Sequence, residues 1–123
     1  MTAWTNDELA KIGAAEELEI APLRSDGTLR KPVTIWVVRH RDALYVRSVN
    51  GRASGWFRGA QDRHEAHIHA GGVDKDVLLV ETDAMNDEID VAYRTKYRRY
   101  AASIVNTTLT TQARGATLKL TPR

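Results

Sequence analysis

The sequence of 123 residues contains no cysteine, only three prolines and a single phenylalanine. The absence of cysteine excludes disulfides, thiol nucleophiles and metal centres ligated by cysteine. No apolar run approaches the ~20 residues that a membrane-spanning helix needs. Residues 1–8 also lack the basic and apolar segments of a secretory signal. We therefore expect a cytoplasmic protein with no membrane partner.

An excess of charge of either sign is also missing. Eighteen Lys and Arg face sixteen Asp and Glu, which leaves a net charge of +2. Nucleic-acid binding usually needs a concentrated basic field, so we expect no nucleic-acid partner. One alternative is a small barrel that stacks single-stranded bases on Trp36, Tyr45 and Trp56, and the near-neutral charge argues against it.

The composition is that of a folded globular protein. Apolar residues make up 42% of the chain and charged residues 28%, and the length suits one domain with one core. No linker or internal repeat interrupts the sequence. We expect residues 1–123 to form a single domain.

The first half of the chain predicts a helix followed by strands. Thr5 and Glu8 have the spacing of a capping box, which predicts that a helix begins there. Residues 18–22 alternate as a short edge strand, and Asp26-Gly27 predicts a hairpin turn. Residues 33–38 (VTIWVV) are β-branched or aromatic throughout, so we expect a central strand that is buried on both faces.

The second half predicts four more strands, interrupted by helices. Asp83 or Asn86 is expected to cap the longer helix, whose acidic start and basic end match the helix dipole. Its Ile89 and its tyrosines at 93, 97 and 100 share one face, which favours core packing over a ligand pocket. The expected segments are strands over 44–49, 65–70, 77–80 and 116–121, a short helix over 56–61, and the longer helix before the last strand.

This order of elements predicts an α+β protein. Six strands are joined mainly by short turns, with one helix before them and another before the last strand. Such a pattern is typical of a small, partly open antiparallel β-barrel.

Residues 44–58 bring a strand, a glycine-bounded loop and three arginines together. Guanidinium groups bind phosphate through paired N–H donors, and the loop amides near Gly51 can form an anion-binding nest. This stretch therefore predicts an anion site that includes Arg47, Arg52 and Arg58. Hydrated arginines on a solvent-facing hairpin are the alternative. Trp56 either stacks on a planar ligand or packs in the core.

Two other chemistries have less support. His67 and His69 share one face of an expected strand, but His64 points elsewhere and no familiar ligand spacing completes a metal site. We expect no metal and interpret these histidines as exposed or cross-strand residues. Ser48 lacks the G-x-S-x-G context of a nucleophile, and we assign no catalytic residue.

The order of these motifs resembles the FMN-binding split-barrel superfamily, which includes pyridoxamine-phosphate oxidase-like and deazaflavin-dependent nitroreductase-like proteins. Within it, the chain is most similar to an uncharacterised bacterial domain family. The resemblance spans nearly the whole chain. It rests on Trp4 at the helix start, Asp26-Gly27, residues 35–38, residues 44–48, Gly51 with Trp56, residues 93–97 and residues 118–120.

The resemblance implies a six-stranded split barrel and a homodimer that holds its ligand at the subunit interface. It also implies that Ser48, Gly51, Arg52, Trp56 and Phe57 contact a cofactor phosphate. The chain departs from the relatives at Gly55, where they carry proline. It departs again at residues 58–60 (RGA), where they carry Asn-Leu.

Two functions are therefore expected. The first is a protein that binds FMN or a deazaflavin and acts as an oxidoreductase on a small organic molecule. In it, Trp56 flanks the ring or supports the loop, and the phosphate is held by Arg47, Ser48, Arg52 and Arg58. The alternative is a cofactor-free module that binds a small anionic, phosphorylated ligand.

Overall fold

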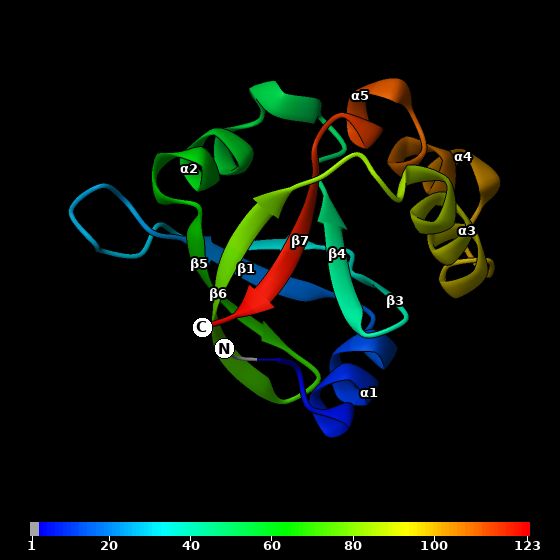
Figure 1. The fold of residues 1–123 in the computed structure, drawn as a ribbon. Coiled ribbons are helices and arrows are strands. Elements are labelled where there is room, and N and C mark those ends of the chain that lie inside the picture. The colour runs from blue at the N-terminus through cyan, green and yellow to red at the C-terminus, as the bar shows by residue number, and fades with distance from the viewer. Residues whose placement is uncertain (1–2) are drawn as a thin grey trace.

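The computed structural model describes residues 3–123 and has an α+β fold built on one antiparallel sheet (Figure 1). The sheet has seven strands in the order β2-β1-β5-β6-β7-β4-β3, one more strand than the six predicted. Their bounds are β1 Leu18–Pro22, β2 Val33–Ile35, β3 Val38–His40, β4 Ala43–Arg47, β5 Glu65–Ala70, β6 Val73–Glu81 and β7 Thr117–Pro122.

The extra strand arises because residues 33–38 do not form one strand. They divide into β2 and β3, which lie at opposite edges of the sheet, so the prediction of a central buried strand is wrong. β2 pairs with β1 and β3 pairs with β4. β1 consequently lies inside the sheet, between β2 and β5, and the prediction of an edge strand there is also wrong.

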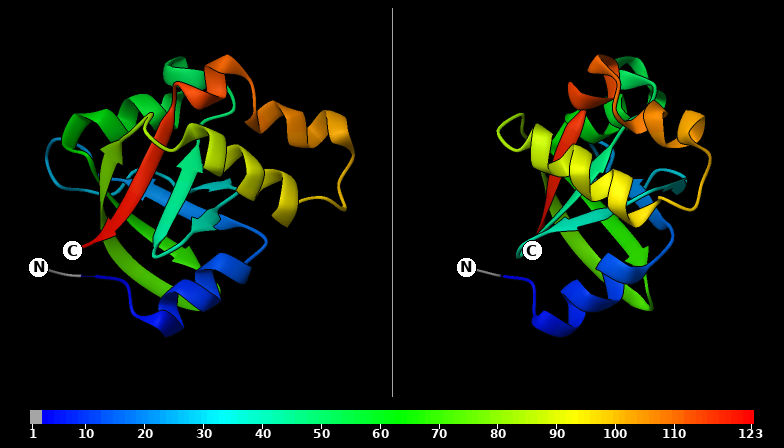
Figure 2. Two further views of the ribbon diagram at one scale, coloured as in Figure 1. Left: turned by 45° about the vertical axis from the view of Figure 1, so that its right-hand side comes forward. Right: turned by 90° about the vertical axis from the view of Figure 1, so that its right-hand side faces the viewer.

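The division of residues 33–38 explains the shape of the sheet. Because β2 and β3 are separated in sequence only by Trp36 and Val37, the two edges of the sheet must approach each other at that point. The sheet therefore curls into a half-barrel whose split is spanned by this short connection (Figure 2). This arrangement is the split barrel that the sequence predicts.

Two helices adjoin the barrel strands. α1 (Asn6–Ala14) begins at the predicted capping box, in which the Thr5 side chain accepts a hydrogen bond from the Glu8 amide and the Glu8 carboxylate accepts one from the Thr5 amide. Its Leu9 and Ile12 are buried in the barrel interior. α2 (Gly55–Arg63) follows the 3-10 turn Gly51–Ala53 and is capped by the Ser54 side chain.

The remaining helices lie outside the barrel, on the side of β3 and β4 (Figure 2). The N-cap residue of α3 (Asn86–Lys96) is Met85, and neither Asp83 nor Asn86 provides a capping side chain, so that prediction is wrong. The prediction that the stripe on this helix packs in a core is confirmed, since Ile89, Tyr93 and Tyr97 are buried. The threonine-rich segment that follows forms α4 (Ala102–Val105), the 3-10 turn Asn106–Thr108 and α5 (Thr111–Arg114).

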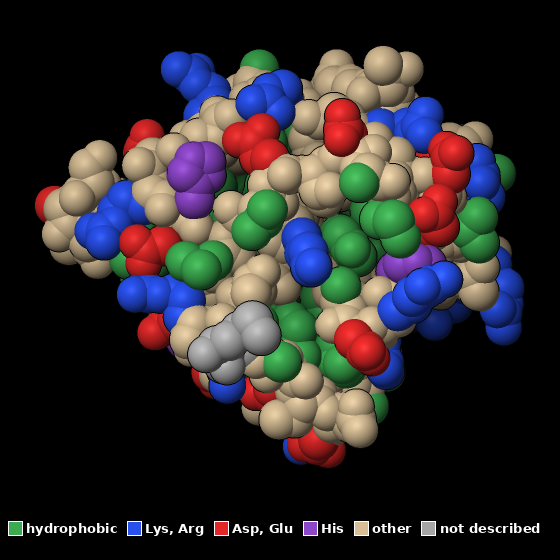
Figure 3. All heavy atoms as spheres, viewed as in Figure 1, with side chains coloured by type: hydrophobic (Ala, Val, Ile, Leu, Met, Phe, Trp, Pro, Cys, Tyr) green, Lys and Arg blue, Asp and Glu red, His purple; other side chains and the backbone are tan. Residues whose placement is uncertain are grey.

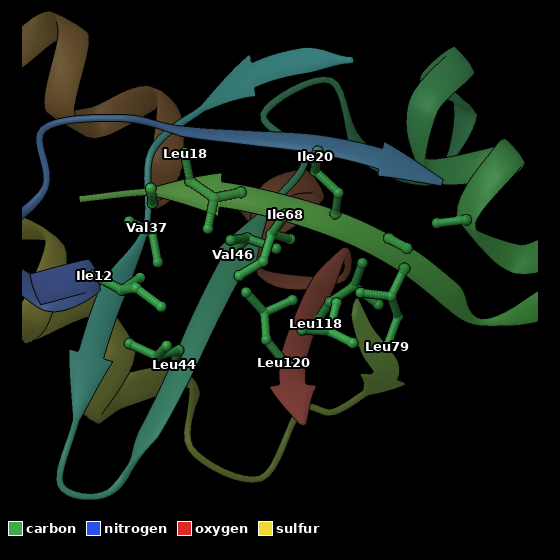
Figure 4. Packing of buried hydrophobic residues seen from close by; sticks show 14 of the residues in the cluster. Ile12, Leu18, Ile20, Val37, Leu44, Val46, Ile68, Leu79, Leu118 and Leu120 are labelled. Atoms are coloured by element: carbon green, nitrogen blue, oxygen red, sulfur yellow. The ribbon is translucent and has the colours of Figure 1, made fainter. Parts of the chain in front are cut away.

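The hydrophobic residues form two clusters, one on each side of β4. Inside the barrel, side chains from the strands and α1 point toward one another (Figure 4). Outside it, α3 packs its apolar stripe on Val38 and Tyr45. β4 contributes to both clusters because successive side chains of a strand point to opposite faces. Leu44 and Val46 point inward, while Tyr45 points outward.

Acidic and basic side chains are interspersed over the face drawn in Figure 3. Small apolar patches separate them, and Leu78, Val80 and Val91 are among the exposed apolar residues of the chain. In the part of the chain that the structure describes, every helix is too short or too polar to cross a membrane.

Candidate functional site

A cavity of about 320 Å³ lies at the split of the barrel, where the chain passes from β2 to β3. The end of β4, the loop after it, α2, α3 and the segment around α4 complete its walls. Most of its exposed lining is apolar. The residues that matter most for its chemistry are Ile35, Trp36, Arg47, Ser48, Trp56 and Tyr93.

α3 holds the connection between β2 and β3 in place. The Tyr97 hydroxyl accepts a hydrogen bond from the Val37 amide (3.2 Å) and lies 3.1 Å from the Val37 carbonyl, to which Lys96 Nζ also donates (2.6 Å). The Trp36 ring stacks on Tyr97 with 3.8 Å between ring centroids. Burial lowers the pKa of Lys96 to about 8. The Val37 amide and carbonyl lie between β2 and β3, and these contacts give both groups hydrogen-bond partners. The stacking on Tyr97 fixes the Trp36 indole as one wall of the cavity.

Arg47 ends β4 and its guanidinium is fully buried. Nη1 donates to Asp90 Oδ1 (2.5 Å) and to the Thr108 carbonyl (2.8 Å), and Nε donates to Thr117 Oγ1 (2.9 Å). Nη2 donates to the carbonyl and the side-chain oxygen of Asn86 (3.2 and 3.1 Å). A guanidinium has five N–H donors, and here each one has an acceptor within the protein.

The loop after β4 is shaped by its own hydrogen bonds. The Ser48 hydroxyl donates to the Gly51 carbonyl (2.8 Å) and lies 2.7 Å from the hydroxyl of Ser54. Gly51 has a φ of +77°, and a Cβ placed there would come within 2.4 Å of Gln112 Cγ. Glycine is therefore required at this point of the loop. The rigid loop carries the chain into α2 and places Trp56 on the cavity wall.

The structure divides the predicted site residues into two groups. Arg47, Ser48 and Trp56 line the cavity. The others lie outside its lining, each in a different setting. Gly51 shapes the loop, Phe57 is fully buried in the barrel core, Arg52 pairs with Glu81 (2.7 Å) on the surface, and Arg58 is exposed.

Sequence reasoning missed several residues of the cavity. Val49 and Asn50 lie in the predicted loop but were not singled out, although their position beside Ser48 is a usable signal. Ile104 and Thr107 come from the threonine-rich segment, where the sequence offers no comparable signal. Tyr93 was assigned to the core; its ring is in the core, but it also forms part of the cavity wall.

The electrostatic character of the cavity follows from Arg47. Among residues 3–123 it is the only charged side chain in the lining, and it is neutralised by Asp90 at 2.5 Å. The hydroxyl of Tyr93 is also uncharged at neutral pH, because burial raises the pKa of this phenol. The cavity thus presents an apolar, neutral surface with hydroxyl and amide groups at its edges.

The histidines lie elsewhere. His67 and His69 share one face of β5 as predicted, and they face Asp74 and Asp76 of β6 at 2.9 to 3.2 Å. The hydrogen bonds to Asp76 and Asp74 raise the pKa of His67. His64 is in the left-handed C-cap position of α2. Among residues 3–123, no group of three or more His, Asp or Glu side chains is arranged to hold a metal ion.

Comparison with solved structures identifies the same architecture in several proteins. An F420 reductase matches with 10% identity and a TM-score of 0.60, covering 94% of this chain and 92% of its own. HutZ, the heme storage protein of Vibrio cholerae, matches with 12% identity and a TM-score of 0.62, covering 96% and 89%. The conserved hypothetical protein Rv2991 from Mycobacterium tuberculosis matches with 11% identity and a TM-score of 0.64, covering 98% and 81%.

At such low identities these likenesses establish the fold. No curated protein sequence matches the chain. Residues 8–120 match a family described as an uncharacterized protein conserved in bacteria, DUF2255. Because that match spans nearly the whole sequence, and the fold is the split barrel shared with these solved structures, the chain is a split-barrel member of the DUF2255 family.

Proposed function

We propose that this protein binds the ring system of a flavin-type cofactor, FMN or a deazaflavin, in the cavity at the barrel split. The proposal rests above all on one observation: an apolar cavity with an indole in two of its walls, Trp36 and Trp56, lies where the sheet edges meet. Planar rings bind well between aromatic and apolar surfaces. Two proteins with similar folds are described as an F420 reductase and a heme storage protein, and these descriptions support a cofactor with a planar ring here.

The dimensions and chemistry of the cavity fit a ring better than a whole nucleotide. Ligand sites span ~300–1,000 Å³, so a cavity of about 320 Å³ lies at the small end of that range. Its neutral, mostly apolar lining suits an uncharged ring. A phosphate would be unfavourable inside, because Arg47 already uses all five of its donors.

We place the phosphate outside the cavity, next to the loop and the start of α2. Arg58 is exposed there, and among residues 3–123 its side chain forms no ion pair or hydrogen bond with another group. Arg52 is also exposed, but phosphate would have to compete with Glu81 for it. In this assignment Ser48 and Gly51 shape the loop, and Trp56 contacts the ring. Phe57 supports Trp56, since their rings lie edge to face with centroids 5.9 Å apart.

The reaction proposed is oxidation or reduction of a small organic molecule. A bound flavin supplies the hydride chemistry, and a protein of this kind binds, orients and shields it. The chain's own contribution is then the apolar wall of Ile35 and Trp36, which excludes water from one side of the ring. This division of labour explains why no acid–base pair or nucleophile is needed in the lining.

Titration of the purified protein with FMN and with F420 tests the proposal. We expect micromolar binding of one of them, seen as a change in its absorbance or fluorescence, together with a higher melting temperature. Trp56→Ala should weaken binding roughly tenfold, as expected for loss of one aromatic stacking contact. Trp4→Phe changes a tryptophan outside the cavity lining and is the control, with affinity unchanged.

Absence of binding by both cofactors at high concentration would contradict the proposal. Stabilisation by a phosphorylated metabolite under the same conditions would instead favour the cofactor-free binding module.

We also propose that the protein forms a homodimer, as its resemblance to other split-barrel proteins implies. Light scattering coupled to size exclusion should then give twice the chain mass of 13.8 kDa. A mass of one chain across the micromolar range would contradict this proposal.

A further inference from the structure

We infer that the Tyr93 hydroxyl is the hydrogen-bond donor that fixes the ligand in this cavity, and that the buried part of the ligand is a planar, uncharged ring with an acceptor oxygen or nitrogen. The inference rests on the proposed function, because it concerns the same cavity. It adds the polar contact that would orient the ring and the class of group that would receive it.

The starting observation is a hydroxyl proton without an acceptor. Tyr93 is 1% exposed, and its Oη makes no hydrogen bond of good geometry among residues 3–123. The Arg47 backbone amide lies near enough to act on it as a donor, but no group accepts its proton. Buried polar groups in proteins nearly always have partners, because a hydroxyl that leaves water without a new hydrogen bond loses its hydration uncompensated. A buried hydroxyl proton with no acceptor in the protein therefore indicates that a ligand supplies the acceptor.

Tyr97 provides a comparison, because it is a buried tyrosine of the same region whose hydroxyl has hydrogen-bond partners within the protein. It lies one turn further along α3 and is also fully buried, yet its hydroxyl contacts the Val37 amide, the Val37 carbonyl and the Glu16 carbonyl within 3.2 Å. The two rings pack together with centroids 6.2 Å apart. The same helix thus satisfies one phenol completely and leaves the proton of the other without an acceptor.

The position of Tyr93 indicates where its partner must come from. Its ring packs against the Arg47 guanidinium, with 5.5 Å between Cζ and the ring centroid, but a guanidinium carries only donors and cannot accept the hydroxyl's proton. Tyr93 is also part of the cavity wall. The cavity is therefore the space from which an acceptor can approach. Because burial raises the pKa of Tyr93, the hydroxyl keeps its proton at neutral pH and donates it.

The charge of the surroundings limits the class of acceptor. A carboxylate or phosphate buried in the cavity would lose its hydration without gaining a free counter-charge, since Arg47 is paired with Asp90. A carbonyl oxygen or a ring nitrogen accepts from a phenol without that cost. The Trp36 and Trp56 walls favour a flat ring, so the acceptor belongs to a planar heterocycle or a quinone-like carbonyl compound.

Tyr93→Phe is the decisive variant, with Tyr97→Phe as its matched control. In the ligand-free protein, Tyr93→Phe should leave the melting temperature unchanged or raise it, because it removes a buried hydroxyl whose proton has no acceptor. Tyr97→Phe should lower it, because three contacts are lost. If Tyr93→Phe lowers the melting temperature as much as Tyr97→Phe, the hydroxyl has an internal partner and the inference is wrong.

Binding is measured with quinoline and naphthalene, which have the same shape and differ by one ring nitrogen. By ligand-observed NMR, wild type should prefer quinoline about fivefold, as expected for one neutral hydrogen bond, and Tyr93→Phe should bind the two equally. A preference that persists in the variant, or wild type that shows none, overturns the inference.

The probes contain no flavin, so their result can be separated from that of the cofactor titrations. If FMN and F420 fail to bind but the preference for quinoline depends on Tyr93, only the proposed cofactor is rejected. Cofactor binding that Tyr93→Phe leaves unchanged would reject only the inference.

Discussion

At the scale of single residues, Arg47 best illustrates how burial decides a side chain's role. Its charge and its position before a glycine loop are typical of a residue that binds phosphate. Its guanidinium, however, lies inside the protein and donates to five internal acceptors. Removal of one partner of a buried ion pair leaves the other charge uncompensated. Arg47 therefore holds β4, α3 and the segment around Thr108 together, and it contributes to the cavity mainly through this framework.

Arg47→Ala should lower the free energy of unfolding by about 3 kcal/mol, because Asp90 would remain buried with only its longer contact to Arg114 (Nε to Oδ2, 3.4 Å) to balance its charge. Arg52→Ala is the control in the same loop region. Its pair with Glu81 is half-exposed, so the loss should be at most about 1 kcal/mol. Urea denaturation followed by circular dichroism measures both. Equal losses for the two variants would mean that the Arg47 pair does not carry this stability.

At the scale of elements, the loop between β4 and α2 sets the position of one cavity wall. Its conformation depends on Gly51 in the left-handed region, on the Ser48 hydroxyl and on the Ser54 cap of α2. Gln112 of α5 packs directly over Gly51, so a helix near the C-terminus restricts a loop from the middle of the chain. Trp56 lies one residue inside α2 and moves with this loop.

Gly51→Ala should destabilise the protein by about 1–3 kcal/mol, because the new Cβ meets Gln112 and the backbone is strained for an L-residue. Gly55→Ala is the matched control, since that glycine has open space around it and no positive φ. It should be neutral or slightly stabilising at the start of α2. Thermal melts of both variants check this, and a Gly55 variant as unstable as the Gly51 variant would contradict the explanation.

At the scale of the whole molecule, the two hydrophobic clusters share one strand. The barrel interior takes Leu44 and Val46 of β4, and the outer cluster under α3 takes Tyr45 of the same strand. Arg47 then joins that strand to Asp90 of α3. Loss of either cluster would expose one face of β4, so the barrel and its outer helices should depend on each other.

We therefore propose that residues 1–123 fold as one domain with a single cooperative unfolding transition. Far-ultraviolet circular dichroism reports the sheet and helices, while the near-ultraviolet signal reports aromatic packing, including the Trp36–Tyr97 stack. The two urea curves should coincide. If the aromatic signal is lost at a lower urea concentration, the outer helical layer unfolds separately and the one-domain proposal is wrong.

The sequence by itself determined the local structure. The α1 capping box, the strand over residues 65–70 and the apolar stripe of α3 were all predicted from it. These local features depend on residues within about one turn or one strand of each other, and their physical causes can be read from spacing. The resemblance also predicted the split-barrel class, which the structure confirms, while the binding role of residues 44–58 stays a prediction.

Only the tertiary structure decided which strands pair and which groups accept hydrogen bonds from Arg47. The composition of residues 33–38 favours a strand, but only the closure of the barrel divides it between β2, which pairs with β1 at one edge of the sheet, and β3, which pairs with β4 at the other. Likewise, the acceptors of Arg47 lie 43, 61 and 70 residues away, at Asp90, Thr108 and Thr117. Spacing in the sequence carries no information about such contacts, because they form only when the sheet curls and α3 packs on its outer face.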